Sequence, residues 1–126
     1  ESSMDTPLPK INHDILIELE PKGLATNDFL KAGEYLELIV REGENKVLGK
    51  VVGDTITLVK PLLIKSVKGG GISTYSMEYL KIFLNVFEPT TLEFSKAKPC
   101  KVTTVLYDDK NVIGSVSMWL APRVES

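Results

Sequence analysis

Residues 101–120 read KVTTVLYDDKNVIGSVSMWL, and this stretch decides the expected fold. Two largely apolar runs, 101–106 and 112–120, flank the polar tetrapeptide 108–111, Asp-Asp-Lys-Asn. Aspartate favours the first position of a turn, and asparagine tolerates the left-handed conformation that tight turns need. The stretch therefore predicts a β-hairpin, and as the last strand pair of the chain it is a candidate sheet edge.

Upstream of this hairpin, apolar and polar residues alternate in several short runs. Ile15, Ile17 and Leu19 lie on one face of a predicted strand. Residues 35–41 and 46–52 flank the turn 42–45 and predict a second hairpin. The further predicted strands cover residues 55–60, 62–67, 91–95 and 101–106.

Two segments are less regular. Pro61 cannot donate to a strand ladder, so it implies a bulge, an edge position or a change of sheets. Residues 78–88 fit either a helix or a strand, because Leu80, Ile82 and Leu84 alternate while Phe83 and Phe87 complete a helical stripe. The aromatic content of the second face favours a strand.

About eight or nine strands without a recurring crossover helix predict an all-β fold. We expect an antiparallel β-sandwich of jelly-roll or Ig-like type, with a closed antiparallel β-barrel as the alternative. Residues 1–12 are expected to form a flexible arm, and residues 13–126 a single domain. Residues 26–33 allow a short helical turn.

The composition is that of a globular protein, with 126 residues, 43% hydrophobic and 25% charged. The longest apolar runs are too short for a membrane-spanning helix, so we expect a soluble domain. Cys100 stands alone, which excludes an internal disulfide and leaves the compartment open. The net charge is uneven, −6 over residues 1–45 and +5 over residues 46–107. Either the molecule has an acidic and a basic side, or folding interleaves the two segments.

The sequence lacks the residues for most catalytic chemistries. His13 is the one histidine, and its neighbour Asp14 would point to the opposite face of a strand. The glycines at 69–71 do not match a phosphate-binding motif. Asp108 and Asp109 suit a turn better than an acid pair. We expect no enzyme, no metal site and no cofactor.

Contact with another protein, or self-association, is the favoured interpretation. Exposed aromatic and basic side chains would supply the contacts, and the candidate interaction residues are Trp119, Phe83, Phe87, Lys65, Lys68, Lys96 and Lys98. A pI near 5.5 makes nucleic acid an unlikely partner, whereas peripheral contact with an anionic membrane stays open.

The segment from Thr104 to Asp109, followed by Trp119, resembles a strand-turn-strand segment of vesiculovirus-type matrix proteins. It covers under a fifth of the chain, and the strongly basic N-terminal region of that family is absent here. The resemblance implies a matrix-like protein that contacts an anionic membrane or a nucleoprotein. No functional residue is carried over from it.

Three functions therefore follow as expectations. The first is a non-enzymatic interaction or assembly module, a structural component of a secretion apparatus or a virus particle. The second is a β-barrel that binds a small apolar ligand in a cavity lined by Leu80, Ile82 and Leu84. The third is the viral matrix-like protein.

Overall fold

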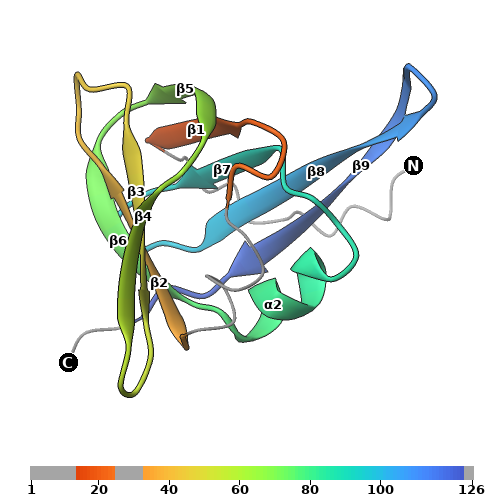
Figure 1. Ribbon diagram of the computed structural model, residues 1–126. Helices are drawn as coiled ribbons and strands as arrows, with labels where there is room; N and C mark the ends of the chain where they lie inside the picture. The colour runs from red at the N-terminus through yellow and green to blue at the C-terminus, as the bar shows by residue number, and fades with distance from the viewer. Residues whose placement is uncertain (1–13, 25–32, 124–126) are drawn as a thin grey trace, which may run out of the picture.

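A computed structural model describes residues 14–24 and 33–123 (Figure 1). These residues form nine strands and one helix. The elements are β1 (Ile15–Leu19), β2 (Tyr35–Val40), β3 (Val47–Val52), β4 (Thr57–Pro61), β5 (Ile64–Lys68), β6 (Gly71–Ser76), α2 (Glu78–Leu84), β7 (Thr91–Phe94), β8 (Cys100–Asp108) and β9 (Asn111–Leu120).

The strands form two antiparallel sheets. Sheet A has the order β5-β1-β7-β8-β9, and sheet B has the order β4-β3-β2-β6. The prediction of a mostly β, antiparallel fold is confirmed. Neither sheet closes on itself, so the barrel alternative is wrong, and the jelly-roll or Ig-like sandwich is not confirmed.

Both predicted hairpins are present. In the last one, β8 and β9 pair from Cys100 opposite Leu120 to Asp108 opposite Asn111. Asp109 has a φ of 62°, so the left-handed residue of the turn is Asp109 and not the expected Asn111, which begins β9. The hairpin of β2 and β3 pairs in full register.

The Pro61 prediction is confirmed in two ways. Pro61 ends β4, which lies at the edge of sheet B, and β5 after it belongs to sheet A. The N–H of Leu62 donates to the carbonyl oxygen of Val47 on β3 at 2.9 Å. Because successive backbone N–H groups of a strand point to opposite sides, the nitrogen of Pro61 points away from β3. The missing N–H of the proline therefore costs no ladder bond.

The strand predicted over residues 78–88 is wrong, because Glu78–Leu84 forms helix α2. As a helix, the segment buries Leu80 and Phe83 on one side, while Ile82 is 62% exposed. Phe87 continues this stripe, and its ring centroid lies 5.0 Å from that of Phe83. The helix places both aromatic rings on the same side as Leu80, against the core. In a strand, the two rings would have lain on the face opposite to Leu80.

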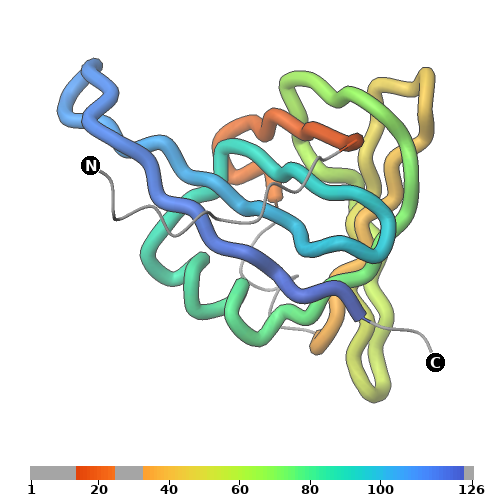
Figure 2. The backbone as a smooth tube through the Cα atoms, turned by 180° about the vertical axis from the view of Figure 1, so that it is seen from behind, coloured from red at the N-terminus to blue at the C-terminus, as the bar shows by residue number. Residues whose placement is uncertain are grey.

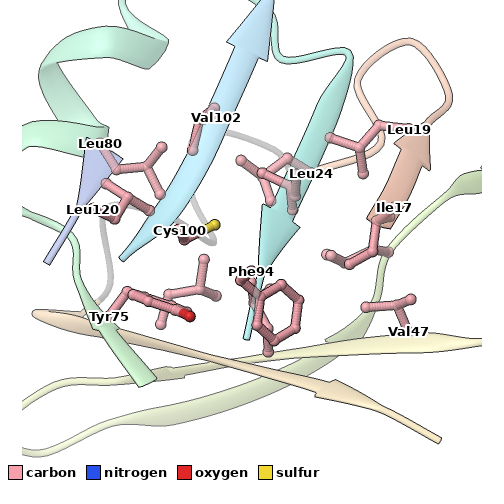
Figure 3. Packing of buried hydrophobic residues seen from close by; sticks show 14 of the residues in the cluster. Ile17, Leu19, Leu24, Val47, Tyr75, Leu80, Phe94, Cys100, Val102 and Leu120 are labelled. Atoms are coloured by element: carbon pink, nitrogen blue, oxygen red, sulfur yellow. The ribbon is translucent and has the colours of Figure 1, made fainter. Parts of the chain in front are cut away.

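The apolar side chains of both sheets and of α2 meet in one core (Figure 3). Ile17 and Phe94 come from sheet A, Val47 and Tyr75 from sheet B, and Leu80 from α2, and each is 0% exposed. Among the described residues, no helix is long and apolar enough to cross a membrane.

The two oppositely charged sequence segments are interleaved by strand pairing. Glu37 on β2 lies opposite Lys50 on β3, and β1, from the acidic segment, lies between β5 and β7, which come from the basic segment. The charge asymmetry of the sequence therefore does not divide these sheets into an acidic and a basic side.

Candidate interaction surfaces

Strand β4 presents an open edge. All five of its residues are exposed, and β3 is its one partner among the described strands. Val59 is 55% exposed, and neighbouring Ile56 is 51% exposed. An exposed edge with apolar side chains is a template for a strand from another chain.

Strand β9 is one of the two edge strands of sheet A, the other being β5. It is ten residues long, and with β8 it extends beyond the rest of the sheet (Figures 1 and 2). Near the tip, Tyr107, Val112 and Ile113 are between 59% and 65% exposed. Two open edges on opposite sides suit head-to-tail assembly.

Trp119 lies on the outer face of β9, directly opposite Lys101 on β8. The Nζ atom of Lys101 is 5.8 Å from the centroid of the Trp119 ring, within the range of a cation–π contact. The tryptophan is half-buried, so part of its ring faces the surface. Of the three predicted aromatic anchors, Trp119 is the one that lies on the outer face of a sheet.

Tyr75 holds the turn that carries Lys96 and Lys98. Its hydroxyl donates a hydrogen bond to the carbonyl oxygen of Lys98 at 2.9 Å and lies 3.3 Å from that of Ser95. Burial raises the pKa of the Tyr75 hydroxyl well above its usual value. The hydroxyl therefore stays protonated and acts as a fixed link between β6 and the β7–β8 turn.

The chain end beyond β9 joins sheet B. The N–H of Arg123 donates to the carbonyl oxygen of Thr74 at 2.8 Å, and Pro122 forms an isolated bridge with Tyr75. The Arg123 guanidinium carbon lies 4.4 Å from the ring centroid of Tyr35. These contacts cover part of the β6 edge, so β4 is the more open edge of sheet B.

The two predicted phenylalanine anchors pack against the core, whereas the four predicted lysines are exposed. Phe83 is 9% exposed, and Phe87 packs against the core. Of the four lysines, Lys65 lines a groove at the far end of β1. Lys68, at the other end of β5, is level with Glu93 on β7, next to the turn that carries Lys96 and Lys98. Strand pairing therefore places three of these lysines at one end of sheet A and Lys65 at the other.

The ligand-binding prediction is wrong as well. Leu80, Ile82 and Leu84 lie on α2, where Leu80 is in the core and Ile82 faces outward. They therefore line no common cavity.

Nothing in the described residues assembles a catalytic or metal centre. No group of three or more potential metal ligands occurs there, and His13 lies outside the described residues. Cys100 is fully buried, and burial raises the pKa of its thiol, which suppresses the reactive thiolate.

Comparison with solved structures identifies the fold. The chain matches A. fulgidus PCNA, from its complex with the C-terminal region of FEN-1, with a TM-score of 0.73 over 94% of this chain and 50% of that one, at 19% identity. It matches the PCNA2–PCNA3 complex from Sulfolobus tokodaii with a TM-score of 0.71 over 99% of this chain and 53% of that one, also at 19% identity. The fold is thus that of the sliding clamps.

Sequence comparison gives a more specific relative. The DNA polymerase sliding clamp of Nitrosopumilus maritimus (strain SCM1) is 32% identical over 138 aligned positions, which cover 99% of this chain and 53% of the relative. The chain therefore spans about half the length of that protein. No protein-family model matches the sequence.

These comparisons correct the expected function. The predicted component of a secretion apparatus or virus particle is wrong, and so is the matrix-like alternative, because the relatives are DNA polymerase sliding clamps. The prediction that nucleic acid is an unlikely partner also loses its support. The prediction of a non-enzymatic protein is confirmed by the comparisons, since sliding clamps are non-enzymatic processivity factors.

Proposed function

We propose that this chain is part of a DNA polymerase sliding clamp, a non-enzymatic ring that encircles duplex DNA. The observation that carries the proposal is the 32% identity to an archaeal sliding clamp over 99% of the chain. The open edges at β4 and β9 support it, because a ring needs two complementary contact surfaces on each unit.

A topological experiment tests the proposal. A ring around DNA is retained on a closed circle at high salt, because the link is topological and does not depend on phosphate contacts. We expect the assembled protein to stay with nicked circular DNA in a salt wash and to leave once a restriction enzyme linearises the circle. Equal loss from circular and linear DNA would contradict the clamp function.

We also propose contact with protein partners through the surface around Trp119. The A. fulgidus relative binds the C-terminal region of FEN-1, and Trp119 is the predicted aromatic anchor that reaches a sheet surface. The lysines Lys65, Lys68, Lys96 and Lys98 stay proposed contacts, with Lys68, Lys96 and Lys98 at one end of sheet A and Lys65 at the other. Exchange of Trp119 for alanine should weaken capture by a FEN-1 C-terminal peptide, whereas exchange of exposed Tyr79 should not.

The domain boundaries stay a proposal. The arm expected over residues 1–12 lies outside the described residues, and residues 13–126 are proposed as one domain because a single core joins both sheets.

A further inference from the structure

A groove of about 420 Å³ lies between the end of β1, the loop from α2 to β7, and the outer part of β8. Three carboxylates line it, those of Glu18, Glu20 and Glu88, and among its described lining residues Lys65 is the one base. We call it the acidic groove. Its formal charge of −2 repels anions and attracts basic groups.

One wall of the acidic groove is an unpaired strand edge. Strand β7 pairs with β8 from Lys101 to Thr103, and no described strand continues on that side. The last bond of this ladder runs from the N–H of Thr90 to the carbonyl oxygen of Thr103 at 2.7 Å. Since backbone groups alternate sides along a strand, the N–H and C=O of Val105 also face this side, toward the groove.

Apolar side chains of β8 also line the groove, and one of its three glutamates is held in place by hydrogen bonds. Val105 and Tyr107 line the groove, and Tyr107 is 59% exposed. The Glu88 side chain accepts a hydrogen bond from the backbone N–H of Lys22, and the hydroxyl of Thr104 donates to the Glu88 carbonyl oxygen at 2.9 Å. Apolar side chains beside carboxylates match lysine and arginine, whose aliphatic stems pack on apolar surface while their charged ends pair with carboxylates.

We propose that the acidic groove binds an extended, basic segment of a partner protein, which adds as a strand to the open edge of β8. Backbone hydrogen bonds to Val105 supply the pairing, and the carboxylates of Glu18 and Glu20 select lysine or arginine at alternate positions. An acidic segment is excluded by its charge. This inference goes beyond the clamp function and does not rest on it.

Peptide binding to the full chain tests the charge requirement. The probe is a fluorescent peptide of alternating lysine and valine, and the comparison peptide alternates glutamate and valine. We expect fluorescence anisotropy to show binding of the lysine peptide alone, weakened by added salt. Equal binding of both peptides, or of neither, would overturn the proposal.

Two sets of variants locate the binding. The double exchange E18Q/E20Q should weaken the lysine peptide about tenfold, because each exposed charge pair contributes a few-fold. The matched pair E42Q/E44Q, in the β2–β3 turn, should leave the affinity unchanged. Equal losses in both double variants would show general attraction to an acidic protein and sink the idea.

A third pair of variants tests the strand addition. V105P removes the N–H that faces the groove and keeps the ladder to β9, whereas V105T keeps both. We expect V105P to abolish peptide binding and V105T to retain it, with circular dichroism showing that both fold. Peptide binding that survives in a folded V105P variant would overturn the inference. Self-association that the E18Q/E20Q variant abolishes would also overturn it, because the groove would then bind a second copy of this chain.

Discussion

At the scale of single residues, the Tyr75 hydroxyl is the clearest link between the sheets. It donates to the Lys98 carbonyl oxygen at 2.9 Å from a fully buried ring. Y75F should lower the free energy of unfolding by about 1–2 kcal/mol, because a part-buried hydrogen bond to the Lys98 carbonyl oxygen is lost. Urea unfolding measures this, and Y79F, at a residue that is 64% exposed, is the control expected to change little.

Cys100 should make the stability depend on alkaline pH. Its thiol pKa is raised by burial in the folded state, so the stability it contributes is complete below the unfolded pKa, near 8.5, and is lost as pH rises above it. The free energy of unfolding should fall by up to about 1.4 kcal/mol per pH unit from there. C100A should remove this part of the slope in urea titrations between neutral pH and about pH 10; an unchanged slope would contradict it.

At the scale of elements, α2 shows that the helical or strand repeat of a segment determines which of its side chains are buried. Residues 78–84 permit two patterns, and only the helical one buries Leu80 while exposing Ile82. L80A should therefore cost about 2–5 kcal/mol of unfolding free energy. I82A, on the same helix, should cost less than about 0.5 kcal/mol. Similar losses for both would favour the strand that the sequence suggested.

The turn between β5 and β6 contains consecutive glycines and packs against the start of β1. Gly69 has a φ of 87°, and a Cβ atom there would collide with the Asp14 carbonyl oxygen. Gly43 has nearly the same φ, 85°, with open space around it. G43A should cost about 1 kcal/mol for its backbone conformation alone. G69A should cost clearly more in the same thermal unfolding experiment, because a backbone atom must also move.

At the scale of the whole molecule, the open edges at β4 and β9 lie on separate sheets. We expect copies of the chain to assemble by strand pairing at these edges. Val59 lies two residues before Pro61, so its N–H also points away from β3. V59P should remove one bond from a contact at this edge, whereas V59T keeps it. We expect V59P to shift sedimentation velocity profiles toward single chains and V59T to resemble the unaltered protein. Identical profiles for both variants would show that the contact between copies is not at the β4 edge.

The sequence by itself determined the local elements whose signals are short-range. Alternation set β1, the turn residues set the β2–β3 and β8–β9 hairpins, and Pro61 marked a sheet edge, because each depends on neighbours a few positions away. The sequence also placed Trp119 on a strand of the last hairpin, because the turn residues before it mark that hairpin clearly.

Only the tertiary structure decided which elements share a sheet, where α2 packs, and which charges meet. Glu18 and Glu88 are 70 positions apart, yet both line the acidic groove, because antiparallel pairing of β1 with β7 brings their strand ends together. The unpaired edge of β8 likewise arises from a mismatch in strand length between β7 and β8. Such contacts depend on strand order, which local patterns do not encode.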